Sequence, residues 1–177
     1  MPRDRLYDFI VALDPSGAYD EGKGTTGWAV FNALDNKIYN AGHLCATSHK
    51  TRFGYYDAHV CLIRHFHQRY GDRMCVVLED YRVYASRATS HIHSRMETCR
   101  LIGVLEYFCD TQDIPVYFQG ATLVKQRWTN NILKYKGFLK IHKQKLIIPD
   151  TDIHVDRHMI DAIRHAVHFA TFSNKEE

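Results

Sequence analysis

Residues 8–33 read DFIVALDPSGAYDEGKGTTGWAVFNA and hold two apolar runs separated by a turn-rich segment. The first run, 8–14, ends on Asp14, residues 15–26 are rich in Gly, Ser and Thr, and residues 27–33 are mainly apolar again. Residues 37–44 form a further strand-like run, and Asp35 and Asn36 before it are typical turn residues. The pattern predicts a chain that opens with three antiparallel strands.

The rest of the chain alternates helical and strand-like patterns. The run Cys75–Leu78 is wholly apolar and suits the centre of a sheet. Strand, helix and strand in succession predict a parallel crossover. The remaining elements are expected as helices at 55–70, 90–111, 122–133 and 156–172, a strand at 114–118 and a second basic element at 138–148. We therefore predict a single domain, residues 1–177, with an α/β fold: a five-stranded mixed sheet, three antiparallel strands followed by parallel strands, flanked by helices.

Composition excludes several classes of protein. With 45% hydrophobic and 24% charged residues the chain is typical of a globular protein, and no apolar run approaches the roughly 20 residues of a membrane-spanning helix. Residues 1–8 carry charges of both signs without an apolar signal core, which predicts a cytoplasmic protein. The sequence has no Gly-x-x-x-x-Gly-Lys-Ser/Thr loop, so no nucleotide cofactor is expected.

Positive charge is concentrated in two stretches. Residues 114–149 contain seven Lys or Arg and no carboxylate, and residues 81–96 contain three Arg, two His and no carboxylate. Such segregation indicates a polyanionic partner such as a nucleic acid. For either stretch alone, a solvated helix face is an equally good interpretation.

Carboxylates stand where α/β folds usually place their chemistry. Asp14 ends the first strand, Glu79 ends the strand taken as central, and Asp161 lies on the last helix in a polar stripe with His158, His165 and His168. Three acids from separate elements can bind two Mg²⁺ ions, as phosphodiester hydrolysis by a two-metal mechanism requires. Isolated acids at strand ends and on a helix surface are the alternative.

Several motifs together resemble RuvC-type Holliday junction resolvases of the ribonuclease H-like superfamily. Asp14-Pro15-Ser16-Gly17 leads to Thr26-Gly27-Trp28 as in the first motif of that family, and Val76-Val77-Leu78-Glu79 is similar to its second. The remaining matches are Arg100 and Gly103 on the following helix, Lys125 after the fifth strand, and His158-Met159-Ile160-Asp161-Ala162 near the C-terminus. The protein could be a viral member of this family.

The resemblance implies a Mg²⁺-dependent endonuclease that acts as a homodimer and resolves four-way DNA junctions by paired nicks. Asp14 would bridge two Mg²⁺ ions, which Mn²⁺ would replace, Glu79 and Asp161 would complete their coordination, and His158 would be a ligand or a proton carrier. Residues expected to bind DNA are Arg82, Arg87, Arg95, Lys125, Arg127, Lys134 and Lys136. The resemblance implies that the protein is located in the bacterial cytosol or in the cytosol of a virus-infected cell, and location in an organelle is an open alternative.

Two departures from the family pattern matter. The connection between Asp14 and Thr26 is longer than usual and carries Asp20, Glu21 and Lys23, and His158 stands where the family often has a carboxylate. Asp80 is a rival for the role of Glu79, although adjacent strand residues face opposite ways and only one can enter the site.

Two other functions stay open from the sequence. One is a different ribonuclease H-like nuclease, such as the nuclease part of a viral packaging terminase, and the other is a non-catalytic DNA-binding module on the same fold. The intact Asp14, Glu79 and Asp161 favour an enzyme.

Overall fold

The computed structural model describes residues 5–81 and 96–175. Within them, five strands form one mixed sheet in the order β3-β2-β1-β4-β5. The strands β1 (Phe9–Asp14), β2 (Thr25–Asn32) and β3 (Lys37–Cys45) pair antiparallel, whereas β4 (Met74–Asp80) is parallel to β1 and β5 (Val116–Gly120) is parallel to β4. The predicted order of three antiparallel strands and a parallel portion is confirmed.

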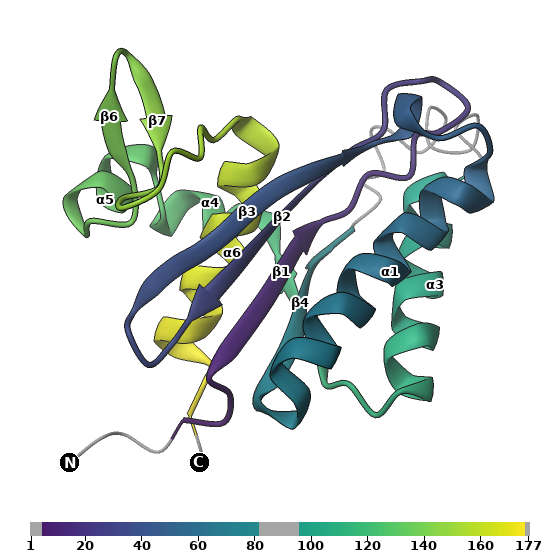
Figure 1. Cartoon of the computed structure of the whole chain (residues 1–177), viewed down its shortest axis with the longest axis horizontal. Coiled ribbons are helices and arrows are strands. Elements are labelled where there is room, and N and C mark those ends of the chain that lie inside the picture. The colour runs from purple at the N-terminus through teal and green to yellow at the C-terminus, as the bar shows by residue number, and fades with distance from the viewer. Residues whose placement is uncertain (1–4, 82–95, 176–177) are drawn as a thin grey trace.

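Helices cover both faces of this sheet, as Figure 1 shows. One face carries α1 (Arg52–Tyr70) and α3 (Glu97–Thr111), and the other carries α6 (Arg157–Phe172) with the short helices α4 (Ala121–Arg127) and α5 (Asn130–Tyr135). None of these described helices is long and apolar enough to cross a membrane.

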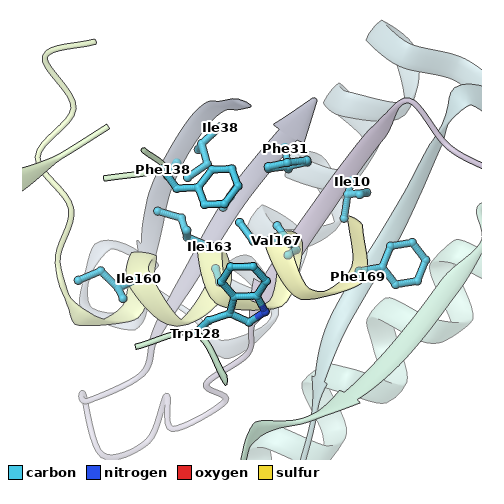
Figure 2. Packing of buried hydrophobic residues seen from close by; sticks show 14 of the residues in the cluster. Ile10, Phe31, Ile38, Trp128, Phe138, Ile160, Ile163, Val167 and Phe169 are labelled. Carbon is cyan, nitrogen blue, oxygen red and sulfur yellow. The ribbon is translucent and has the colours of Figure 1, made fainter. Parts of the chain in front are cut away.

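Two hydrophobic cores follow from strand alternation. Successive strand residues face opposite sides of a sheet, so Val11 and Leu13 of β1 enter the core under α1 and α3, whereas Ile10 and Ala12 enter the core under α6. Figure 2 shows this second core, with Ile10 of the sheet close to the side chains of α6. Any polar residue that continues the Ile10–Ala12 series must therefore face α6.

The last helix lies unusually close to the sheet because β2 contributes a glycine at the contact. A Cβ atom on Gly27 would lie 2.0 Å from the carbonyl oxygen of His158, so a residue with a side chain does not fit there. The helix begins after Asp156, whose side chain accepts a hydrogen bond from the backbone N–H of Met159 at 2.9 Å. His165 in its polar stripe is fully buried, so this stripe faces protein rather than solvent.

The segment between β5 and α6 differs from the prediction. The single helix expected over 122–133 is two helices, α4 and α5, with the buried Trp128 between them. Thr129 starts the second helix by accepting a hydrogen bond from the N–H of Ile132. The basic element over 138–148 is a hairpin of β6 (Lys140–His142) and β7 (Lys145–Ile147), which stands clear of the sheet in Figure 1.

Candidate active site

Three carboxylates meet at one edge of the sheet. Asp14 ends β1 and Glu79 lies near the end of β4, and because these strands are neighbours and parallel the two residues share an edge. Both face α6, since Ala12 and Val77, two residues earlier in each strand, belong to the core under that helix. Asp161, in the second turn of α6, completes the group, which we call the carboxylate cluster.

A lysine ammonium lies within the carboxylate cluster. Nζ of Lys125, on α4, is 3.3 Å from Oε2 of Glu79 and 3.2 Å from Oδ2 of Asp161. These ion pairs show that Glu79 and Asp161 are close enough to share one cation. Lys125 was expected to contact DNA, and the structure places its charge in the cluster itself.

The pKa values of two carboxylates in the cluster are shifted in opposite directions. Burial, together with the charge of Glu79, raises the pKa of Asp14 to about 7. Burial also opposes ionisation of Glu79, but the hydrogen bond with His165 and the charge of Lys125 outweigh it and hold the pKa of Glu79 below its ordinary value. The negative charge therefore resides on Glu79, and Asp14 is the carboxylate that an additional cation would ionise.

Arg164 anchors Asp161. Its Nη1 donates a hydrogen bond to Oδ1 of Asp161 at 2.6 Å, while its Nε donates to the carbonyl of Trp128 and its Nη2 to Oδ1 of Asn130, both at 2.8 Å. One guanidinium thus connects α6 with the junction of α4 and α5. Because the other two nitrogens of this guanidinium are hydrogen-bonded to Trp128 and Asn130, Arg164 fixes the position of Asp161 as well as neutralising its charge.

A buried histidine and a glutamine adjoin Glu79. Nε2 of His165, one turn after Asp161 in α6, lies 3.0 Å from Oε2 of Glu79. Nδ1 of the same ring lies 3.0 Å from Oε1 of Gln119, a residue of β5 that is the register partner of Glu79. The sequence indicates His165 only as a member of the polar stripe, and no local pattern singles out Gln119.

His158 is not hydrogen-bonded to the cluster within the described residues, and Asp80 faces the other side of β4. Nε2 of His158 accepts a hydrogen bond from Nε of Arg157 at 3.2 Å, and within the described part of the chain His158 makes none with the three carboxylates. Asp80 follows Glu79 in β4 and by strand alternation belongs to the opposite face. Of the two neighbours, Glu79 is the one in the cluster.

The long connection between β1 and β2 is fastened to the opposite face of the molecule. Asp20 forms an ion pair with Arg52 of α1, and its backbone N–H donates to Oε2 of Glu97 at 3.3 Å. The N–H of Gly17 donates to Oγ1 of Thr98 at 3.1 Å. A Cβ atom on Gly17 would lie 2.2 Å from the backbone of Glu97, so this loop and the start of α3 are in direct contact.

The remaining residues expected to bind DNA lie on the surface or outside the described residues. Arg82, Arg87 and Arg95 fall in 82–95, which the structure does not describe. Arg127 lies over the ring of Phe172, 4.4 Å from its centroid. Lys134 is half-buried in α5 and Lys136 directly after it is exposed, and both precede the exposed hairpin lysines Lys140, Lys143 and Lys145.

The carboxylate cluster fits a hard divalent cation in its chemistry. Its donors are carboxylate oxygens, the ligands that Mg²⁺ prefers, and burial together with the charge of Glu79 raises the pKa of Asp14, a shift that a bound cation would offset. Within residues 5–81 and 96–175, no three His, Cys, Asp or Glu side chains are already arranged around a metal position. The ammonium of Lys125 lies between Glu79 and Asp161 instead, so metal binding requires this side chain to move.

Comparisons with known proteins identify the fold. No protein-family model and no curated protein sequence matches the chain. Among solved structures, Thermus thermophilus RuvC in complex with a Holliday junction substrate matches with a TM-score of 0.63 and 14% identity, covering 95% of this chain and 98% of that one. A second structure of Thermus thermophilus RuvC matches with a TM-score of 0.60 and 15% identity, over 94% and 97% of the two chains.

A eukaryotic structure matches as well. The yeast mitochondrial Holliday junction resolvase gives a TM-score of 0.53 at 13% identity, and the match covers 96% of this chain and 80% of that one. The shared coverage includes the strands and the last helix that carry the carboxylate cluster, since nearly the whole chain is matched in each case. The chain therefore has the ribonuclease H-like fold of the RuvC-type Holliday junction resolvases.

Proposed function

We propose that this chain is a metal-dependent endonuclease that resolves four-way DNA junctions by paired, symmetric nicks. The observation that carries the proposal is the convergence of Asp14, Glu79 and Asp161 at one edge of a RuvC-type sheet. Similar folds occur in a protein solved with a Holliday junction and in a mitochondrial resolvase. Fold alone does not determine an activity, and here the carboxylate cluster supplies the chemical part of the argument.

Asp14, Glu79 and Asp161 would hold two Mg²⁺ ions, with Mn²⁺ as a substitute. Bound there, the ions supply an activated water and stabilisation of the leaving 3′-oxygen. Positive charge next to Asp14 would lower its raised pKa and ionise it, so binding relieves the repulsion among the carboxylates. His158, one turn before Asp161 in α6, would be a further ligand or a proton carrier.

The chain's own cations have separate tasks in this proposal. Arg164 holds Asp161 in place from α6. Lys125 balances the cluster in the absence of a substrate, and its flexible stem lets the ammonium turn toward a phosphate when the carboxylates take up metal. The positive charge is then retained next to the phosphodiester bond, where it favours the approach of an anionic backbone.

DNA arms would lie along the basic surface beyond α4. Lys136 and the hairpin lysines Lys140, Lys143 and Lys145 are exposed, and among the described residues none of them forms an ion pair with an acidic side chain. Unpaired surface cations of this kind bind phosphates and release counterions. A homodimer would present two carboxylate clusters to the junction, one for each of two opposed strands.

Cleavage of a synthetic four-way junction tests the proposal. The purified chain, supplied with Mg²⁺, should cut the junction and leave a linear duplex of the same arm sequence intact. D161N serves as the inactive control and should bind the junction without cutting it. Equal cutting of the junction and the duplex would refute junction selectivity, and cleavage by D161N at the wild-type rate would refute the carboxylate cluster as the active site.

A further inference from the structure

His165 lies between a carboxylate of the cluster and a side-chain amide. The ring is completely buried between β4, β5 and α6. One ring nitrogen, Nε2, faces Oε2 of Glu79, and the other, Nδ1, faces the side-chain amide of Gln119, each at 3.0 Å. A carboxylate oxygen only accepts hydrogen bonds, so Nε2 of His165 carries a hydrogen and donates it to Glu79.

The other ring nitrogen pairs with the amide of Gln119. Where Nδ1 of His165 carries a hydrogen, it donates to Oε1 of Gln119, which lies 3.0 Å away. Among the described residues, the amide nitrogen of the same Gln119 is buried without a hydrogen-bond partner. Where Nδ1 of His165 carries no hydrogen, a half-turn of the amide, which exchanges its oxygen and nitrogen, lets Nε2–H of Gln119 donate to Nδ1, so the amide pairs with the ring in either state.

We infer that Gln119 and His165 are positioning residues, in which the Gln119 amide holds the His165 ring and the ring's Nε2–H holds Oε2 of Glu79 in one orientation within the carboxylate cluster. This inference rests on the proposed function in that Glu79 is taken as a metal ligand. The resulting chain of hydrogen bonds runs from β5 through α6 to β4. It is a contact that only the folded sheet and the last helix create.

A buried ring that is fixed on both sides suits this task better than a flexible side chain does. Lys125, which also contacts Oε2 of Glu79, carries a full charge that competes with a divalent ion for the carboxylate. The His165 ring is held at its other nitrogen by Gln119, and its burial keeps water from replacing it. In metal sites, groups that do not bind the metal themselves donate hydrogen bonds of this kind to the carboxylate ligands and set the orientation of those ligands.

Metal binding by the full chain without DNA is the direct test. We would titrate Mn²⁺ into wild type, H165F, H165Q and Q119L by calorimetry, and measure the Mg²⁺ concentration that gives half-maximal junction cleavage. H165F keeps the ring volume and removes the donor, so it should weaken metal binding about 10- to 100-fold. H165Q restores an N–H donor and should stay within a few-fold of wild type, whereas Q119L should show an intermediate loss.

A double variant separates positioning from general damage. Because Gln119 acts through His165, H165F/Q119L should bind metal no more weakly than H165F alone. The matched control is H168F, which replaces another buried histidine of α6 whose ring contacts Phe172 rather than the carboxylate cluster. H168F should leave metal affinity unchanged. Thermal unfolding establishes which variants fold, and Q119L carries the test if H165F does not.

The outcomes are distinguishable from failure of the proposed function. Wild-type metal affinity in folded H165F, equal losses in H165F and H168F, or independent losses that add in the double variant would each overturn the positioning role. If wild type binds Mn²⁺ and H165F does not, but neither cuts a four-way junction, the positioning role stands and the proposed function falls. If wild type binds no divalent metal, both fall.

Discussion

Asp14 lowers the stability of the folded chain at neutral pH, and its surroundings explain why. Folding buries this carboxyl group beside Glu79, which raises its pKa from 3.8 to about 7. Between these two pH values the folded chain binds more protons than the unfolded chain, so its stability falls as the pH rises. A group held in an unfavourable state in this way is typical of functional sites.

Replacing this carboxylate should therefore increase stability while abolishing cleavage. At pH 8, D14N removes a buried negative charge, and we expect its melting temperature to exceed that of metal-free wild type by a few degrees. Junction cleavage with Mg²⁺ should be lost while junction binding is kept, and E79Q and D161N should lose cleavage too. If D14N melts at a lower temperature than metal-free wild type at pH 8, the ionised Asp14 side chain does not destabilise the folded chain.

His59 predicts the opposite pH dependence at a second buried position. Burial lowers its pKa from 6.5 to about 4, although the hydrogen bond between the ring and the carbonyl of Tyr55 opposes this shift. The unfolded chain binds more protons between these pH values, so stability is lost as the pH falls from about 6.5 to about 4. The full loss corresponds to about 3 kcal/mol.

The comparison of wild type with H59Q isolates this effect. An amide at position 59 does not take up a proton, so the difference in unfolding free energy between the two proteins should change by about 3 kcal/mol from pH 7 to pH 4 in disfavour of wild type. Urea unfolding at several pH values measures it. Because Asp14 titrates equally in both chains, its contribution cancels, and a difference that is independent of pH would refute a neutral buried His59.

At the scale of single residues, the sequence predicts the three acidic residues but not the side chains that hydrogen-bond to them. Asp14 and Glu79 are found because strand ends and alternation are visible in a local stretch, and the structure brings them together with Asp161. Gln119 and His165 meet only because β5 and α6 pack side by side, and no periodic pattern reports a contact between segments so distant in the chain. Their metal-related roles remain predictions.

Among the elements, the contact of α6 with β2 determines where Asp161 lies. G27A would put a Cβ atom 2.0 Å from the carbonyl oxygen of His158, which must push the helix away from the sheet. We expect a loss of about 1–3 kcal/mol in unfolding free energy and a drop in cleavage, because the helix carries one of the three carboxylates. Chemical denaturation and junction cleavage measure the two effects.

A second glycine provides the control for this variant. Gly103 lies within α3, and a Cβ atom added there meets nothing within 4 Å. G103A should therefore raise stability by about 0.5–1 kcal/mol, through helix propensity alone, and leave cleavage unchanged. Equal effects of G27A and G103A would show that the close approach of α6 is unimportant.

The β6–β7 hairpin offers a test of the DNA surface. Its turn residues Lys143 and Gln144 both have positive φ, of 47° and 65°, a conformation that Asn-Gly adopts more readily. K143N/Q144G thus removes a charge while favouring the hairpin, and K140Q and K145Q remove two more. The combined variant should bind junctions more weakly, with a salt dependence reduced by about 0.9 per lost contact.

R69Q/K175Q, which removes two positive charges where the hairpin variant removes three, is the control for this variant. Arg69, in the last turn of α1, and Lys175, after α6, are exposed cations near the other end of the sheet from Asp14. Their removal should leave the salt dependence of junction binding unchanged. If the hairpin variant shows the wild-type salt dependence, its lysines are a solvated surface.

Element types are predicted better than their boundaries between β5 and α6. The helical pattern runs on across Trp128 and Thr129, so one helix was expected where there are two. The break needs Thr129 as a cap and Arg164, from a helix later in the chain, as a partner for the carbonyl of Trp128. The first of these signals is local and could have been read from the sequence, whereas the second could not.

For the molecule as a whole, a single carboxylate cluster accounts for one cut only. Resolution of a four-way junction requires two cuts, in strands related by the symmetry of the junction. A homodimer with two-fold symmetry presents the same surface from each subunit, and its two clusters are then related by an axis that can coincide with that of the junction. The proposed function therefore predicts both an assembly and a pattern of products.

We expect the chain to be a dimer in solution and to cut a mobile junction at symmetry-related positions. Light scattering measures the first, and sequencing-gel mapping of end-labelled strands the second. Paired nicks leave linear duplexes that DNA ligase seals without further processing. A nuclease of the terminase or repair type would cut one strand or cut without symmetry, leaving gaps or flaps. Scattered cuts whose products ligase does not seal would refute the resolvase assignment. The roles of the three carboxylates in metal chemistry would then depend only on whether D14N, E79Q and D161N lose cleavage.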